Sequence, residues 1–411
     1  MINRPKQLEN ILRFRDTPEL IKVITGVRRS GKSTLLQLYR RRLIDDGVPE
    51  SAVVYVNFED FRFRDIDSAG KLHDYILAIR PAAGVSYIML DEVQLVPEWE
   101  RAVNSLRLDR RNDIYLTGSN AAMLSGTLAT LLSGRYVEIK ILPLSFKEFA
   151  DFRHTRENTR EREVAATGLF DQYLLDGGFP GLIDIAGGGD TANDYLAGIL
   201  NTIIVKDIAI AGKVRDVDIL RKIIEFAASN IGNYLTASKI SGYLTSTGRK
   251  VTADTVDNYL RLLEDAFVFY RAHRYNLKGK HLLKTNNKFY IVDLGLRNAM
   301  TGVGGQDYGA SLENIVFFEL LRRGYQVCVG KYDELEIDFV ASKPDARIYI
   351  QVSATIMDEN TRNRELKPLK ALGDNYPKAL LTMDRLPYSD YDGIRQINII
   401  DFLLSKTPLT T

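Results

Sequence analysis

The sequence predicts an α/β protein that begins with a parallel β-sheet covered by helices. Three observations predict this class. Short apolar runs alternate with helical segments up to residue 150, the segment GVRRSGKST directly follows the run IKVIT, and the run YIML ends in two carboxylates. Apolar strands that alternate with helices are typical of parallel sheets buried on both faces.

The predicted elements follow in order along this part of the chain. Strands are expected in the runs IKVITG, AVVYVNF, SYIMLDE, DIYLTGS and RYVEIKIL. Helices are expected over residues 32–42, 69–79, 98–107 and 120–132. This alternation predicts helices on both faces of the sheet.

Composition limits the class of protein. The chain has 411 residues, of which 45% are hydrophobic and 26% charged, as in ordinary globular proteins. A net charge of +2 argues for no partner by itself, and the single cysteine, Cys328, excludes an intrachain disulfide. A reducing, cytoplasmic location is expected. No stretch approaches about 18 uninterrupted apolar residues, so no membrane span is expected, and the histidines share no metal-ligand spacing.

The segment GVRRSGKST carries the strongest signal. Its glycines, lysine and serine have the spacing of a P-loop between a strand and a helix. Backbone N–H groups would face phosphate oxygens, Lys32 would reach the β- and γ-phosphates, and Ser33 would hold Mg²⁺. ATP and Mg²⁺ are therefore the expected cofactors. The residues expected to line the nucleotide are Gly26, Arg28, Arg29, Ser30, Gly31, Lys32, Ser33 and Thr34.

Two arginines inside this loop raise a separate question, because most P-loops need no charge at their positions. For Arg28 and Arg29 three alternatives stay open: contact with phosphate, contact with acidic residues of an adjacent subunit, or exposure to solvent near a lid.

Polar residues follow three of the predicted strands. Asp91 is expected to orient Mg²⁺ through water, and Glu92 to polarise the attacking water. Asn57 either hydrogen-bonds Glu92 and holds it inactive or is a plain strand-end asparagine. Ser119 or Asn120 either places a polar group beside the γ-phosphate or caps the next helix.

Arg135 stands in LLSGRYVEI, where a predicted helix ends before the fifth strand. A guanidinium there can project to a neighbouring subunit and stabilise charge on the γ-phosphate. The alternative is a surface arginine favoured by the helix dipole. The catalytic residues expected from the sequence are Lys32, Glu92, Ser119, Asn120 and Arg135.

This combination of motifs resembles the AAA+ ATPases. More narrowly, it resembles a prokaryotic family with an N-terminal AAA domain (AAA_14-like) and a C-terminal DUF4143-type domain. The segments that carry the resemblance are ITGVRRSGKST, YVNFED, IMLDEVQ, YLTGSN, LSGR, ILPLSFKEF, LDGGFPG and EIDFV. The resemblance implies the second acidic motif, first-sensor and arginine-finger roles for Asp91, Glu92, Ser119, Asn120 and Arg135. It also implies lid helices near 160–212, with Lys206 and Arg215 as candidates for a second sensor.

The middle of the chain has a winged-helix pattern. VDILRKIIEFAAS, TASKISGYL and TADTVDNYLRLLEDA are expected to be helices, the last capped by Thr252, and FVFYRAHRY and KFYIVD to be strands. The stretch 266–292 contains six Lys and Arg residues and no acidic residue, which suits phosphate contact. The alternative is a protein-interaction or structural module with a solvated basic face.

Interleaved aromatic and basic residues also follow the second strand, in EDFRFRD. Phe61 to Arg64 either grip DNA at a central pore or pack as core contacts of the loop. The candidate DNA-binding residues in the whole chain are Arg62, Arg64, Arg261, Arg271, Arg274, Lys278 and Lys280.

The last segment resembles a PD-(D/E)xK nuclease, a restriction-nuclease-like α/β fold. Glu313 lies on a predicted helix, Asp338 on a strand, and Gln351 on the next strand. The usual Glu-x-Lys reads Gln-Val-Ser here. Metal-assisted cleavage needs carboxylates and usually a lysine, so we expect this domain to be inactive, with a retained role in DNA docking or assembly.

The predicted domains are an AAA+ core (1–155), a helical lid (156–215), a winged helix (216–304) and a nuclease-like domain (305–411). The predicted function is a homo-oligomeric ATPase, expected to be a hexameric ring, that binds, remodels or moves on DNA, including forked or branched DNA in replication or repair. Two alternatives stay open: an ATP-dependent signalling switch or protein remodeller, and an ATP-dependent nuclease of a defence or mobile-element system.

Overall fold

The computed structural model describes residues 4–118, 132, 134–157, 162–185, 189–210, 212–302, 307–385 and 390–405. The chain forms two compact units, each built from two stretches of sequence. Unit 1 comprises Met1–Pro143 and Thr202–Arg215, and unit 2 comprises Leu144–Asn201 and Asp216–Thr411. The segment 202–215, expected in the lid, therefore belongs to the same compact unit as the N-terminal sheet. The bounds of the four predicted domains stay predictions.

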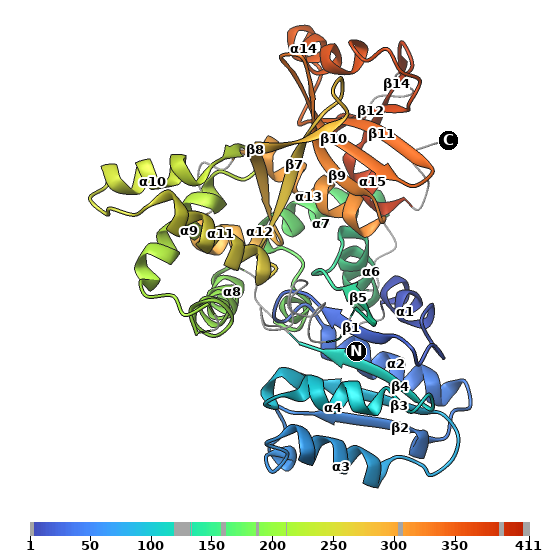
Figure 1. Ribbon diagram of the computed structural model, residues 1–411. Helices are drawn as coiled ribbons and strands as arrows, with labels where there is room; N and C mark the ends of the chain where they lie inside the picture. The colour runs from blue at the N-terminus through green and yellow to red at the C-terminus, as the bar shows by residue number, and fades with distance from the viewer. Residues whose placement is uncertain are drawn as a thin grey trace. The chain divides into compact units, whose positions relative to one another are not determined.

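Unit 1 is a parallel sheet of five strands in the order β2-β3-β4-β1-β5 (Figure 1). The strands are β1 (Ile21–Thr25), β2 (Val53–Asn57), β3 (Ser86–Asp91), β4 (Asn112–Thr117) and β5 (Tyr136–Lys140). The helices are α1 (Pro5–Leu12), α2 (Lys32–Asp45), α3 (Ala69–Ile79), α4 (Trp99–Leu106), three short 3-10 turns at Glu50–Ala52, Phe61–Phe63 and Val93–Leu95, and a π-helix at Ile203–Ile210. Every strand predicted for this part is confirmed. The helix predicted over 120–132 falls almost wholly outside the described residues.

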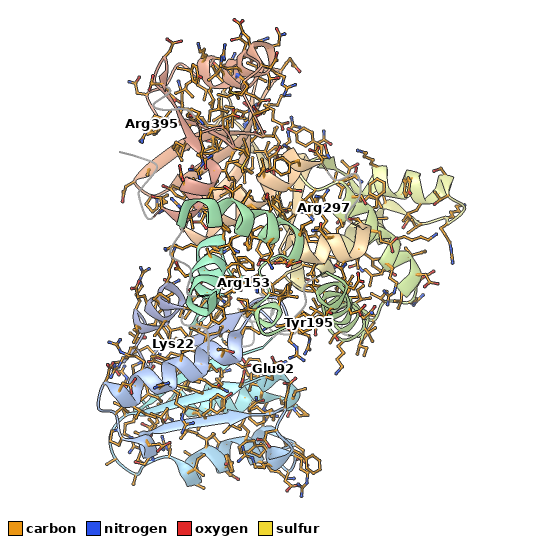
Figure 2. The ribbon with its side chains drawn as sticks, turned by 180° about the vertical axis from the view of Figure 1, so that it is seen from behind. Lys22, Glu92, Arg153, Tyr195, Arg297 and Arg395 are labelled. Atoms are coloured by element: carbon orange, nitrogen blue, oxygen red, sulfur yellow. The ribbon has the colours of Figure 1, made fainter. Side chains whose placement is uncertain are left out.

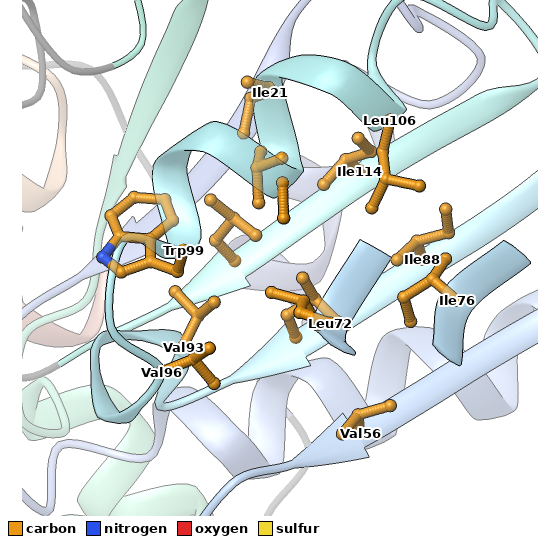
Figure 3. Packing of buried hydrophobic residues seen from close by; sticks show 14 of the residues in the cluster. Ile21, Val56, Leu72, Ile76, Ile88, Val93, Val96, Trp99, Leu106 and Ile114 are labelled. Atoms are coloured by element: carbon orange, nitrogen blue, oxygen red, sulfur yellow. The ribbon is translucent and has the colours of Figure 1, made fainter. Parts of the chain in front are cut away.

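The sheet of unit 1 separates two apolar layers. Successive side chains of β3 point to opposite faces of the sheet. Ile88 and Leu90 lie on the face covered by α3 and α4, whereas Tyr87 and Met89 lie on the face covered by α1 and α2. Figure 3 shows the first layer, where Trp99, the only tryptophan of the chain, packs beside the strands. Because all five strands run the same way, the loops that follow them meet at one edge of the sheet.

A buried ion pair lies near the opposite edge. Lys22, near the start of β1, pairs with Asp113, near the start of β4, and both side chains are fully buried. The Tyr115 hydroxyl donates to Asp113 at 2.8 Å. Burial lowers the pKa of Lys22, and the nearby Asp113 opposes this effect. Figure 2 shows Lys22 and Glu92 toward opposite edges of the sheet, so this pair is a structural feature remote from the phosphate loop.

Unit 2 contains a mixed sheet of nine strands in the order β13-β14-β12-β11-β10-β9-β7-β8-β6. The strands are β6 (Tyr234–Leu235), β7 (Phe269–Asn276), β8 (His281–Ile291), β9 (Gln326–Tyr332), β10 (Leu335–Lys343), β11 (Ala346–Ser353), β12 (Lys378–Thr382), β13 (Asp390–Tyr391) and β14 (Ile394–Asn398). The helices are α6 (Phe146–Glu157), α7 (Arg162–Asp176), a 3-10 turn (Pro180–Asp184), α8 (Asp190–Thr202), α9 (Val217–Ser229), α10 (Ala237–Ser246), α11 (Ala253–Asp265), α12 (Leu294–Thr301), α13 (Tyr308–Arg322), α14 (Glu359–Lys370) and α15 (Ile399–Leu404).

The three helices and the ribbon predicted for the winged-helix segment are present as α9, α10, α11 and the antiparallel pair β7–β8. Thr252 caps α11 by accepting the Thr255 backbone N–H at 3.2 Å, as predicted. The ribbon is not a free wing, because β7 also pairs in parallel with β9. It therefore continues into the C-terminal strands as part of one sheet.

The segment LDGGFPG forms a junction inside unit 2. The Gly178 backbone N–H donates to the Asp293 carboxylate at 2.6 Å, and the Gly178 carbonyl accepts the Leu144 N–H at 2.7 Å. A Cβ at Gly177 would collide with Asp293, and one at Gly178 with the Leu144 carbonyl. Burial raises the pKa of Asp293 to about 6, although backbone N–H groups favour its charged form. This motif thus has a structural role in joining three chain segments.

None of the helices in the described ranges combines the length and the apolar content needed to cross a bilayer.

Candidate functional site

The phosphate loop connects β1 to α2 at the carboxyl edge of the sheet. Gly26 has a φ of +145°, and a Cβ there would collide with the Ile141 carbonyl. Gly31 has a φ of +98° directly before α2 begins, in the left-handed region that glycine adopts without strain. The buried Lys32 ammonium donates to the carbonyl oxygens of Gly26 at 3.0 Å and Val27 at 3.2 Å. Burial lowers the pKa of Lys32 to about 8.

A buried arginine supports this loop. Arg4 donates to the Ser30 carbonyl at 3.0 Å and to the Leu142 carbonyl at 3.0 Å, and its side chain is almost fully buried. Ser30 is buried as well, whereas Thr34 on the first turn of α2 is half-buried. The N-terminal segment therefore fixes the loop from outside the motif, a role that sequence analysis did not identify.

Oxygen ligands converge between this loop and β3. The Ser33 hydroxyl donates to Asp91 Oδ1 at 3.1 Å, and the Tyr55 hydroxyl donates to Asp91 Oδ2 at 2.8 Å. The Thr117 hydroxyl, at the end of β4, also donates to Asp91. A serine hydroxyl and a carboxylate are ligands that Mg²⁺ accepts beside phosphate oxygens. Together with the glycine-dependent loop, these residues fit a nucleotide–Mg²⁺ site, in which the metal would neutralise charge on the phosphates.

Glu92 follows Asp91 in the left-handed conformation, with a φ of +53°. Its backbone N–H donates to the Thr117 hydroxyl at 3.0 Å, and its carboxylate accepts from the Gln94 side chain. A non-glycine residue held in this conformation is a recurrent feature of functional sites. Asn57 Oδ1 accepts the Glu59 backbone N–H at 2.9 Å, which favours the alternative of a strand-end asparagine.

The two loop arginines differ in their surroundings. Arg28 Nε and Nη2 donate to the two carboxylate oxygens of Asp207 at 3.0 and 2.9 Å, within unit 1. None of the three alternatives raised by the sequence included an acidic residue of the same chain. Arg29 is exposed and has a φ of +66°. Lys206 and Arg215, the candidate second sensors, lie in the same segment as Asp207, and both are exposed.

The predicted arginine finger is exposed. Arg135 lies directly before β5, where its carbonyl accepts the Ile21 N–H at 3.0 Å, and the structure assigns its guanidinium no carboxylate partner in the described ranges. Burial and the nearby Arg135 both lower the pKa of Arg107. Two like charges thus lie near one another on this surface. Ser119 and Asn120 lie outside the described residues.

In the loop after β2, each of the two alternatives raised by the sequence applies to a different phenylalanine. Phe61 is 75% exposed, and the Arg64 guanidinium lies 4.5 Å from its ring centroid. Phe63 instead packs against the core, 6.0 Å from the Tyr75 ring. Arg62 is exposed and ion-paired with Asp60 at 2.6 Å. One aromatic side chain is therefore available to a partner, and the other is structural.

Most basic residues of the predicted ribbon have partners inside unit 2. Arg271 pairs with Glu264 at 2.6 Å, and Lys278 pairs with Asp333 at 2.7 Å. The Arg274 guanidinium lies 4.6 Å from the centroid of the Tyr234 ring. Lys280 is exposed at the turn between β7 and β8, and Arg261 is exposed on α11, where it donates to Asn258. The free positive charge is smaller than the sequence suggests.

The nuclease-like residues come together around a lysine. Lys288 Nζ lies 3.2 Å from Glu313, 2.8 Å from Glu336 and 4.0 Å from Asp338. Its side chain is only 6% exposed. Burial lowers the pKa of Lys288, but the three neighbouring carboxylates raise it more, so the pKa of Lys288 is raised overall. Burial raises the pKa of both Glu313 and Asp338.

Gln351 is hydrogen-bonded to Asp338 in the same centre. Its Oε1 accepts the Asp338 backbone N–H at 2.9 Å, and its Nε2 donates to Glu365 at 3.2 Å. Among the described residues, no group of three or more His, Cys, Asp and Glu side chains is arranged to hold a metal ion. The centre does not fit a divalent cation, because the Lys288 ammonium lies where the carboxylates converge. The sequence prediction of an inactive domain stays a prediction, and sequence analysis did not identify Lys288 as the cation among these carboxylates.

Comparison with known families identifies two domains. Residues 18–150 match the family model of an AAA domain, and residues 167–307 match a domain of unknown function, DUF8612. The second match spans most of the predicted lid (156–215) and the predicted winged helix (216–304), and its family is DUF8612 where the sequence suggested a DUF4143-type domain. The N-terminal AAA domain expected from the motifs is confirmed.

Two curated relatives extend over nearly the whole chain. An uncharacterized protein of Haemophilus influenzae is 44% identical over 405 residues, which cover 98% of this chain and 99% of that protein. The uncharacterized protein MJ1544 of Methanocaldococcus jannaschii is 28% identical, over 98% of this chain and 88% of that protein. Among solved structures, a Walker-type ATPase of Pyrococcus abyssi matches with a TM-score of 0.50 and 14% identity, over 73% of this chain and 96% of that chain. This last similarity supports the fold.

Proposed function

Because the chain belongs to one family with the Haemophilus influenzae relative and carries an AAA domain, we propose that it is a Mg²⁺-dependent ATPase that works as a homo-oligomer and acts on DNA. The single observation that carries ATP hydrolysis is the hydrogen bond between Ser33 and Asp91 at 3.1 Å, beside the buried Lys32. These three residues bring together the charge and the oxygen ligands that a nucleoside triphosphate with Mg²⁺ needs.

Each residue has a defined task in this proposal. Lys32 exchanges its two carbonyl partners for oxygens of the β- and γ-phosphates, and its ammonium neutralises their charge. Ser33 and Asp91 would hold and orient Mg²⁺, which would supply charge neutralisation. Glu92 accepts a hydrogen bond from the attacking water and orients it. Thr117 fixes both acidic residues through the two hydrogen bonds of its hydroxyl.

Exposure of Arg135 supports a site completed by a second copy of the chain. A guanidinium without a carboxylate partner in the described ranges is suited to stabilise charge on a neighbour's γ-phosphate. A closed ring, which we propose to be a hexamer, gives each copy one such site and one such arginine. Ser119 or Asn120 would supply the first sensor in this arrangement.

DNA is the proposed partner because of the loop at 61–64. An exposed Phe61 beside the Arg64 guanidinium offers a stacking surface with a positive charge, which suits an unpaired base and its phosphate. Arg261 and Lys280 are exposed on the winged-helix-like segment and would add phosphate contacts. Forked or branched DNA in replication or repair is the proposed substrate class, because such DNA offers unpaired strands.

A protein partner is the second candidate, and one observation favours it. The ion pairs of Arg271 and Lys278 neutralise much of the ribbon's positive charge, which leaves less of it for phosphate contacts. In that case the winged-helix-like segment would bind a protein, and ATP hydrolysis would reset a signalling or remodelling switch.

The test is the rate of phosphate release with no DNA, single-stranded, duplex, forked and four-way-junction DNA at one fixed salt concentration. We expect stimulation by DNA with single-stranded parts, about tenfold weaker in Phe61→Ala, since one base stack contributes 1–3 kcal/mol. Leu108→Ala is the matched control, since Leu108 is also highly exposed in unit 1. A rate unaffected by every DNA, with Phe61→Ala equal to wild type, would favour the protein partner.

A further inference from the structure

We propose that Asp207 is a positioning residue of the nucleotide site: it holds Arg28 until a γ-phosphate competes for that guanidinium, so that the π-helix at residues 203–210 responds to a nucleoside triphosphate and not to a diphosphate. This inference rests on the proposed ATP site. It concerns unit 1 alone, where both residues lie.

Arg28 and Asp207 form an ion pair that is largely buried. Two nitrogens of Arg28 face two oxygens of Asp207 at 3.0 and 2.9 Å, a bidentate geometry. The Asp207 side chain is 2% exposed and that of Arg28 19%. Bidentate recognition suits a phosphate as well as a carboxylate, so the same guanidinium can exchange one for the other.

Asp207 lies on an unusual element. The π-helix Ile203–Ile210 belongs to unit 1, and its side chains Ile203, Ile204 and Ile208 are buried. π-Helices are rare and occur frequently at functional sites. The chain enters this segment from unit 2 after Asn201 and returns to unit 2 at Asp216. A change at Asp207 therefore occurs in the segment that links the two units along the chain.

The charges around the pair belong to the proposed reaction site. Burial raises the pKa of Asp207, its hydrogen bonds with Arg28 and the nearby charge of Lys32 lower it, and Glu92 raises it. Asp207 and Glu92 in turn favour the charged form of Lys32, whereas Arg28 opposes it. Asp207 thus interacts electrostatically with Lys32, which is expected to bind the γ-phosphate, and with Glu92, which is expected to orient water.

Competition follows from the signs of these charges. A γ-phosphate beside Lys32 attracts Arg28 and repels Asp207, whereas a diphosphate carries no group at that position. When Arg28 turns to the phosphate, Asp207 is left as a buried carboxylate without its partner, which is unfavourable unless the π-helix moves. Binding of the triphosphate thereby loosens residues 203–210, and the diphosphate leaves them in place.

The experiment uses the full-length chain in a Glu92→Gln background, which blocks hydrolysis, and measures the dissociation constants of ATP and ADP by calorimetry. Asp207→Asn keeps the shape and removes the charge. We expect it to tighten ATP about tenfold and ADP less than threefold, because only the γ-phosphate competes with the carboxylate. Asp194→Asn, an exposed aspartate on α8, is the matched control and should change neither.

Results that contradict this expectation have different meanings. Equal changes for ATP and ADP, or weaker ATP binding in Asp207→Asn, would overturn the role of Asp207 while leaving the ATP site intact. Wild-type protein that binds no better than Lys32→Ala would instead refute the proposed function. If Asp207→Asn does not fold, hydrogen exchange of wild-type residues 203–210 decides: faster exchange with a non-hydrolysable ATP analogue than with ADP supports the proposal, and equal exchange contradicts it.

Discussion

The Thr117 hydroxyl donates a hydrogen bond to the Asp91 carboxylate, and its oxygen accepts the backbone N–H of Glu92 at 3.0 Å. One residue at the end of β4 thereby fixes the two acidic residues at the end of β3. We predict that Thr117→Val, which removes only the hydroxyl, lowers kcat for ATP hydrolysis about tenfold, in keeping with a lost positioning hydrogen bond. KM for ATP should change less than threefold.

Thr25→Val is the matched control for Thr117→Val, since the Thr25 hydroxyl lies at the end of the neighbouring β1 and donates to Glu138 at 2.7 Å. Steady-state kinetics of both variants check the prediction. An equal loss of kcat in both would show a general effect on the sheet rather than a role of Thr117.

Arg135→Ala should lower kcat about a thousandfold and leave ATP affinity unchanged, because in the proposed ring the guanidinium acts on the developing charge and comes from another copy. Mixing it in equal amounts with Glu92→Gln should restore activity, since about a quarter of the interfaces in a randomly mixed ring then combine an intact Glu92 with an intact Arg135. Phosphate release from the mixture is the measurement. A mixture as inactive as its two components would exclude an arginine supplied in trans.

Lys288→Met should create a divalent-cation site that the natural protein lacks. Without the ammonium, the carboxylates of Glu313, Glu336 and Asp338 have no counter-ion, and breaking such a buried pair costs about 3–5 kcal/mol. Three carboxylates offer Mn²⁺ the oxygen ligands it prefers. We therefore expect a lower unfolding temperature in the variant, partly recovered by Mn²⁺.

The control for the Lys288 prediction is Lys278→Met, which removes the lysine of an exposed ion pair with Asp333. Neither this variant nor the wild type should respond to Mn²⁺. Stabilisation of the wild type by Mn²⁺ that is lost in Asp338→Asn would show that the centre holds a metal beside Lys288, contrary to this account.

Asp293 should make stability depend on pH. Burial raises the pKa of Asp293 to about 6 in the folded protein, above its ordinary value of 3.8, so between these values the folded protein holds a proton that the unfolded chain has released. The stability that this proton contributes is present at low pH and is lost as the pH rises through about 6. Relative to Asp293→Asn, the wild type should gain about 1 kcal/mol between pH 7 and pH 5.

Urea midpoints of both proteins at the two pH values measure the contribution of Asp293. Asp194→Asn, which alters an exposed carboxylate, should follow the wild type at both pH values. A constant difference between wild type and Asp293→Asn would contradict a pKa of about 6 for this carboxyl in the folded protein.

Sequence patterns predicted the parts of the fold that depend on neighbours in the chain. The strands of unit 1, the capping of α11 by Thr252 and the spacing of Gly26, Gly31 and Lys32 are local features, each encoded within a few residues. The end of β3 could be assigned to Asp91 and Glu92 for the same reason. These predictions needed no knowledge of how distant segments meet.

Contacts between distant residues could not be predicted in this way. Arg28 and Asp207 are separated by 179 positions, and Lys288 and Glu313 by 25, and no local pattern joins either pair. The parallel pairing of β7 with β9 likewise arises from tertiary packing, so the basic ribbon could only be interpreted as a free wing. The signal that could have indicated Asp207 is an aspartate within the apolar run IIVKDIAI, since a charge in such a run needs a partner.

The central claim is that the loop at residues 26–33 and the acidic pair hydrolyse ATP. Phosphate release by wild type, Lys32→Ala and Glu92→Gln, measured with Mg²⁺ and with the most stimulatory DNA, tests it most directly. We predict turnover by the wild type, loss of ATP binding and turnover in Lys32→Ala, and retained binding without turnover in Glu92→Gln. Equal phosphate release by all three proteins would contradict the account.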